Sequence, residues 1–104
     1  MPPSDASARF RDNFPRLLGL HGLTQNFASE LLGVSEATVS GWMSGKTTPS
    51  LGKAIAISDL FQISTDRLMG AKFSDLLSKE LADPERFDRV EDRIRRARSK
   101  LRSV

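Results

Sequence analysis

The chain has 104 residues, of which 38% are hydrophobic, and this length and composition suit one small domain with room for no second. It holds no cysteine and a single histidine, which excludes a disulfide framework and a cysteine- or histidine-built metal centre, and fits a reducing cytoplasm. The net charge of +3 is uneven, because residues 1–83 hold eight Lys or Arg against nine Asp or Glu, whereas residues 84–104 hold eight against four.

The first ten residues, MPPSDASARF, are rich in Pro, Ser and Ala, which predicts a mobile N-terminal arm over residues 1–7. They lack the basic and apolar regions of a secretory signal. No apolar run in the chain approaches the roughly 20 residues needed to span a bilayer. We therefore expect a soluble, cytoplasmic protein.

A first helix is predicted after this arm, because apolar residues recur there at helical spacing. Pro15 lies inside the pattern and removes one backbone donor, so we expect a kink or a helix in two pieces. The helix should end within residues 19–22, which include two glycines. Its apolar face comprises Phe10, Phe14, Leu17 and Leu18.

Two short helices joined by a glycine turn are predicted next. Thr24 can cap the first, which begins at Gln25. Gly33 accepts a left-handed backbone without steric cost and lets the chain reverse. Ser35 can then cap the second, which extends over residues 36–44. The inward-facing residues are Ala28, Leu31 and Leu32 in the first helix, and Val39, Trp42 and Met43 in the second.

Three more helices are expected before residue 83. The fourth covers residues 50–61 with Ser50 as its cap, and a short fifth over residues 65–69 is capped by Ser64. A sixth ends near Ala82. The residues expected in the core are Leu51, Ala54, Ile55, Ile57, Leu60 and Phe61 from the fourth helix, and Phe73, Leu76, Leu77 and Leu81 from the sixth.

A seventh helix should begin at Pro84, which suits the first helical position and follows Asp83 as a cap. Its apolar residues recur in alternating steps of three and four, a heptad stripe on an otherwise charged helix. Such a narrow stripe needs a partner, and we favour a second copy of the chain over the chain's own core. The predicted dimerisation residues are Phe87, Val90, Ile94, Ala97 and Leu101.

The central segment carries a set of residues in fixed order: Gln25, Gly33, Val34-Ser35, Trp42, Gly45-Lys46 and Pro49-Ser50. Together they resemble the Cro and lambda-repressor type of helix-turn-helix domain, over about Phe10 to Gly70. The resemblance implies an all-α fold, a five-helix bundle with a C-terminal helical extension. The expected organisation is an arm over 1–7, a DNA-binding helix-turn-helix domain over 8–70 and an extension over 71–104 for dimerisation.

Two phosphate-binding segments are expected on either side of the helix that reads bases. At the first, Thr24, Gln25 and Asn26 begin a helix whose exposed amides can hold a phosphate, and the resemblance implies that Gln25 grips the DNA backbone. The alternative is that Gln25 only caps its own helix. At the second, Lys46 and Thr47 match the family's other phosphate clamp, whereas the alternative is an ordinary solvated lysine.

Base reading should fall to the outward residues of the helix over 36–44. Glu36 can accept a hydrogen bond from a cytosine amino group, and Ser40 can bond several bases. Gly41 stands where the family often has a long polar side chain. Glycine costs helix stability relative to alanine, which suggests that backbone or phosphate approaches closely there, and the alternative is simple tolerance of a weak residue. The full set of base-facing residues is Ser35, Glu36, Ala37, Thr38, Ser40 and Gly41.

The sequence supports no catalytic function, because it has one histidine, no cysteine, no glycine-rich phosphate loop and no paired carboxylates that define a pocket. No enzyme activity and no cofactor are expected. Since residues 1–83 are not strongly basic, affinity for DNA should depend on a few placed contacts and on dimerisation.

We therefore expect a homodimeric, sequence-specific regulator that binds operator DNA, most naturally a repressor of the phage-immunity or small prokaryotic type. The alternative is an antitoxin-like or adaptor module that binds a protein partner through residues 84–104. The basic side chains of that segment can form a solvated face, a further phosphate-binding arm or a site for an acidic partner. They include Arg95, Arg96, Arg98, Lys100 and Arg102.

Overall fold

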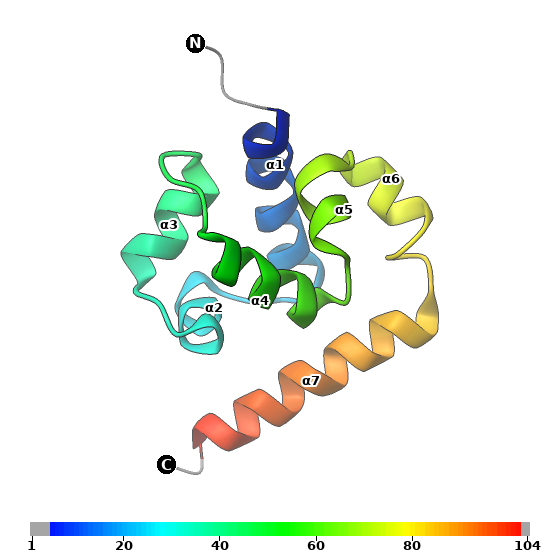
Figure 1. The fold of residues 1–104 in the computed structure, drawn as a ribbon. Helices are drawn as coiled ribbons and strands as arrows, with labels where there is room; N and C mark the ends of the chain where they lie inside the picture. The colour runs from blue at the N-terminus through cyan, green and yellow to red at the C-terminus, as the bar shows by residue number, and fades with distance from the viewer. Residues whose placement is uncertain (1–4, 103–104) are drawn as a thin grey trace.

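A computed structural model describes residues 5–102, which form seven helices and no strand (Figure 1). The helices are α1 (Asp5–Leu20), α2 (Gln25–Leu32), α3 (Glu36–Ser44), α4 (Leu51–Phe61), α5 (Thr65–Gly70), α6 (Phe73–Ser78) and α7 (Pro84–Arg102). The all-α prediction is confirmed. Within this range no helix is both long and apolar enough to cross a membrane.

Helix α1 continues through Pro15, so the prediction of a helix in two pieces is wrong. Phe10 precedes the proline and Leu17 follows it, and both are buried in the same core. This shared packing holds the helix together despite the missing backbone donor. The helix already begins at Asp5, inside the segment expected to be an arm, and residues 1–4 of that arm lie outside the described residues.

The turn between α2 and α3 forms as its sequence predicts. The Thr24 hydroxyl accepts a hydrogen bond from the Phe27 N–H at 3.0 Å and so caps α2. Gly33 ends that helix with a left-handed backbone, φ 67°. The Lys53 ammonium of α4 donates to the Leu32 carbonyl at 2.8 Å, which satisfies an acceptor that the end of α2 leaves without a partner.

Aromatic side chains fill the core between α1 and α3. The Trp42 ring of α3 lies 5.9 Å from the Phe14 ring and 6.5 Å from the Phe10 ring, centroid to centroid. Trp42 is 4% exposed and Val39 is fully buried, so α3 is fixed to the bundle along one face. Aromatic pairs at this spacing contribute beyond the area they bury.

Helix α4 buries only part of the expected set. Ala54, Ile57 and Phe61 face the core, but Leu51 is 73% exposed and Ile55 is 51% exposed. The predicted burial of these two residues is wrong. Leu51 is the first residue of the helix, and the helical period places Ile55 about 100° around the axis from Ala54.

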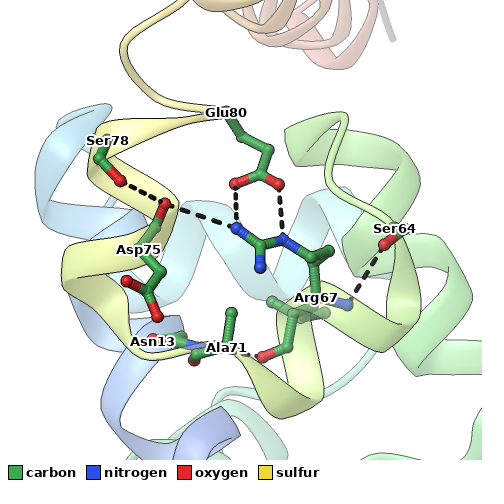
Figure 2. Close-up of polar contacts among 8 residues, drawn as sticks. Asn13, Ser64, Arg67, Ala71, Asp75, Ser78 and Glu80 are labelled. Carbon is green, nitrogen blue, oxygen red and sulfur yellow. Dashed lines mark hydrogen bonds and ion pairs between the residues drawn. The ribbon is translucent and has the colours of Figure 1, made fainter.

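Helix α6 ends at Ser78, four residues before the predicted end, and Leu77 is 45% exposed instead of buried. The turn that follows is held by an ion pair between α5 and Glu80 (Figure 2). Arg67 donates from Nε and Nη2 to the two carboxylate oxygens of Glu80, at 2.7 and 3.2 Å. The hydrogen bond from Arg67 lowers the pKa of Glu80 below its ordinary value. The pair therefore fixes where the chain enters α7.

A buried amide joins the other end of α5 to the first helix (Figure 2). Asn13 Nδ2 of α1 donates to the carbonyls of Leu68 and Ala71, both at 2.9 Å, and the Asn13 side chain is fully buried. These bonds satisfy carbonyls at the C-terminal end of α5.

Helix α7 packs against its own chain, which corrects the predicted pairing between chains. Val90 is 1% exposed and Ile94 is 4% exposed, both within the core cluster. The Phe87 ring stacks on the His21 ring at 4.9 Å, and His21 Nδ1 lies 2.6 Å from a Glu91 carboxylate oxygen.

The stripe therefore finds its partner in the chain's own core, the alternative that the heptad spacing left open. Ala97 is half-buried against the same chain. Of the five predicted dimerisation residues, only Leu101 is exposed, at 41%. The same burial closes most of the stripe to an unrelated protein partner.

Candidate nucleic-acid interface

The outward side of α3 is open to solvent. Glu36, Ala37 and Ser40 are exposed, while Val39 and Trp42 on the opposite side are buried. Within residues 5–102, the side chains of Glu36 and Ser40 make no hydrogen bond or ion pair. The helix is therefore held by its buried apolar side and presents unpaired polar groups on its open side. Reading DNA bases requires this arrangement.

The first turn of α3 uses two of the predicted residues for its own cap. The Ser35 hydroxyl accepts from the Thr38 N–H at 3.0 Å and lies 2.8 Å from the Thr38 hydroxyl. Thr38 is also half-buried. Of the predicted base-facing residues with polar side chains, Glu36 and Ser40 are thus the two whose polar groups remain free for bases.

The segment after α3 lies close to Gly41. A Cβ at this position would lie 2.7 Å from the Thr47 hydroxyl oxygen, so a segment of the chain itself is a close neighbour. The Gly41 carbonyl also accepts from the Lys46 N–H at 2.9 Å and the Thr47 N–H at 3.2 Å. The glycine therefore lets the segment after α3 fold back and fixes Lys46 in place.

Sequence reasoning missed Arg11, which lies against the same segment from α1. A Cβ on Gly45 would overlap Arg11 Cδ and lie 3.1 Å from Arg11 Nη1, and Gly45 itself has φ 79°. Arg11 is exposed and forms no ion pair in the part of the chain that the structure describes. Arg11 thus lies against Gly45, the residue before Lys46, so both cations belong to the loop region after α3. The helical pattern of α1 gave no signal of this contact, because the two segments are far apart in sequence.

At the start of α2, Gln25 and Asn26 are exposed. The first amides that find an acceptor are those of Phe27 and Ala28, both bonded to Thr24. Within residues 5–102, the amides of Gln25 and Asn26 therefore have no acceptor and lie at the positive end of the helix. Thr24 performs the capping that was the alternative role for Gln25, and the Gln25 side chain stays unpaired within residues 5–102.

These segments lie on one side of the bundle. Helices α2 and α3 pack against each other, and Figure 1 shows them on the opposite side from α5 and α6. The arrangement offers an anion-binding helix start, an open polar helix face and a loop with two cations. In the described range no group of three acidic or histidine side chains could hold a metal ion.

Comparison with known proteins agrees with this geometry. A helix-turn-helix family model matches residues 16–68. The crystal structure of a transcriptional regulator from Listeria innocua is similar to this chain, with 30% sequence identity and a TM-score of 0.56. That similarity covers 86% of this chain and 92% of the regulator's chain. Among curated proteins, none matches.

Proposed function

This chain belongs to the helix-turn-helix family of DNA-binding transcription regulators, which are not enzymes, and we propose that it acts as a homodimeric repressor that reads operator DNA with α3. The observation that carries the proposal is the open side of α3, where Glu36 and Ser40 are exposed and unpaired within residues 5–102. Exposed polar side chains that no neighbouring residue holds are free to exchange bound water for base edges.

In this proposal the contacts divide into two kinds. Glu36 and Ser40 contact base edges in the major groove and set the sequence preference. The amides at the start of α2, with Gln25, and the cations Lys46 and Arg11 contact phosphates and set the position of the protein on the duplex. Ala37, exposed beside Glu36, can press on a thymine methyl group.

The test is selection of bound fragments from random duplex, followed by affinity measurements on the selected sequence and on mutated half-sites. Glu36→Ala and Ser40→Ala should change which base is preferred, by about 1–3 kcal/mol at one position each. Lys46→Ala should weaken all sequences alike and lower the salt dependence of binding. Unchanged base preference in both α3 variants would reject the proposed reading helix.

We place the homodimer contact on α4. Leu51 and Ile55 lie one turn apart and expose apolar side chains, at 73% and 51%. Exposed apolar residues grouped on one helix are typical of protein contacts. A symmetric pair would place two α3 helices in successive major grooves about 34 Å apart, which strengthens binding that one module alone makes weak.

Solution mass and operator affinity test this contact. Leu51→Lys with Ile55→Lys should yield a monomer that binds a single half-site normally and a two-half-site operator more weakly. Leu77→Lys is the control, because Leu77 is an apolar residue of similar exposure, 45%, on a different helix, α6. A monomeric wild type that binds the full operator without cooperativity would refute the dimer.

Repression follows from operator occupancy when the operator overlaps a promoter. A reporter gene placed behind the selected operator should be transcribed less when the protein is present, and the Glu36→Ala variant should relieve this effect. Increased transcription would identify an activator instead.

A further inference from the structure

The C-terminal helix lies outside the matched segment 16–68, but it is fixed to it. Besides the buried Val90 and Ile94, the Arg93 guanidinium of α7 donates to the Asp59 carbonyl at 2.7 Å and pairs with the Asp59 carboxylate at 3.1 Å. Figure 1 shows that α7 runs from the side of α6 toward α2. The last turns of α7 therefore have a defined place beside the helix-turn-helix.

Arg98 is the contact between this helix end and α2. Its guanidinium carbon lies 4.6 Å from the centroid of the Phe27 ring, a cation–π distance. Phe27 is the third residue of α2 and follows Gln25 and Asn26, whose amides lack acceptors. Lys100 follows two residues later and lines a shallow hollow together with Glu30 and Leu31 of α2. The ring of Phe27 therefore has a partner on α7.

The charge of α7 is concentrated at this end. Six Lys or Arg and no Asp or Glu follow Asp92 up to residue 102. Arg93 is paired with Asp59, and Arg95 and Arg96 are paired with Asp92, at 3.6 and 2.9 Å. Arg98 and Lys100 have no carboxylate partner within residues 5–102.

We propose that Arg98 and Lys100 bind phosphates of the duplex flanking the half-site, and so extend the DNA-binding surface beyond α2. The proposal rests on the proposed function. Residues 1–83 have a net charge of −1, so the helix-turn-helix domain attracts DNA weakly by itself, and the unpaired cations next to α2 compensate for this. Phe27 positions Arg98, and the contact carries no sequence information.

The experiment measures how the affinity of the full chain depends on salt, on a selected operator duplex with long flanks and on one trimmed to its half-sites. Each phosphate contact contributes about 0.9 to the slope of log affinity against log salt. On the long duplex, Arg98→Gln should lower the slope by about 0.9, and Arg98→Gln with Lys100→Gln by about 1.8. On the trimmed duplex, these variants should match the wild type.

Arg89→Gln is the matched control. Arg89 is exposed on the same helix, about 13 Å from Arg98 along the axis, and the substitution removes the same charge. Its slope should equal that of the wild type. Equal slope changes in the Arg89 and Arg98 variants would reduce the effect to net charge and overturn the proposal. Lower thermal stability of the Arg98 variant with an unchanged slope would overturn it in favour of a structural role.

Two further outcomes separate this proposal from the proposed function. If Lys46→Ala lowers the slope and Arg98→Gln does not, the flanking contact is wrong while the DNA-binding function stands. If the wild type selects no duplex at all, the proposed function itself fails. Loss of polyglutamate binding in Arg98→Gln, with the DNA slope unchanged, would assign the site to an acidic polypeptide and overturn the phosphate contact.

Discussion

The two ends of this molecule treat their polar side chains in opposite ways. Around α2 and α3, the side chains of Gln25, Asn26, Glu36, Ser40 and Lys46 are exposed and form no hydrogen bond or ion pair within residues 5–102. Around α5, α6 and α7, several side chains are paired within the chain: Arg67 with Glu80, His21 with Glu91, Arg93 with Asp59, and Arg95 and Arg96 with Asp92, while Arg98 and Lys100 at the end of α7 are not paired with a carboxylate within residues 5–102.

The difference shows which charges stabilise the fold and which remain for a partner. Paired side chains join elements of the same chain, as Arg67 does between α5 and the turn before α7. Even the one lysine of α4, Lys53, is used internally, because its ammonium binds the end of α2. Unpaired side chains on the α2–α3 side contribute little to stability and are free for DNA.

The largest expected effect concerns the packing of α7 on the core. Ile94→Ala should lower the free energy of unfolding by about 2–4 kcal/mol, because it opens a cavity where α7 packs on the core. Chemical denaturation measures this loss, and the solution mass should not change. A change of mass without loss of stability would mean that Ile94 pairs between chains, and would restore the interpretation that the structure corrects.

The next effect compares an unpaired with a paired arginine of α1. Arg11→Gln should lower the salt slope of DNA binding by about 0.9, because Arg11 lies over Gly45 next to Lys46 with no ion pair in the described range. Arg16→Gln is the control, since Arg16 pairs with Asp12 at 3.2 Å and lies over the Phe73 ring. It should leave the slope unchanged. Equal slopes for both variants would show that Arg11 makes no phosphate contact.

A smaller effect tests why the reading helix carries a glycine. Alanine normally stabilises a helix interior by about 1 kcal/mol relative to glycine. Gly41→Ala should gain less than this, because the new methyl group meets the Thr47 hydroxyl. In a Thr47→Ala background the same change should give the full gain. Equal gains in both backgrounds, measured by thermal unfolding, would contradict the structural role of Gly41.

The sequence predicts the local structure of this protein better than its long-range contacts. Caps at Thr24 and Ser35 and the glycine turn at Gly33 depend on neighbours within a few residues, and each forms as predicted. The exposure of Ile55 and the contact of Arg11 with Gly45 depend on how whole helices are placed. A stripe of period 3.5 in α7 likewise predicts an apolar partner but not which surface provides it.

The site shows the same division. The exposed side of α3 follows from its sequence, because the buried Val39 and Trp42 fix the opposite side. That Thr47 lies against Gly41 could not be predicted, because the loop after α3 has no periodic pattern. The contact between Arg98 and Phe27 could not be predicted from the sequence either, because the two residues are 71 positions apart in the chain.

The smallest effect concerns the Arg67–Glu80 pair, and it should depend on pH. Because Arg67 holds the pKa of Glu80 below its ordinary value, the pair stabilises the fold above about pH 4.3, the usual pKa of a glutamate, and this contribution disappears as the pH falls through the lower value. Glu80→Gln should therefore be less stable than the wild type at pH 7, and the difference should shrink on acidification.

DNA binding at pH 7 should not change in a variant that remains folded, because Glu80 lies on the side of α5 and α6 and not on that of α2 and α3. Thermal unfolding of both proteins from pH 7 to pH 3 measures the difference, and a constant gap over that range would show that the carboxylate charge contributes nothing.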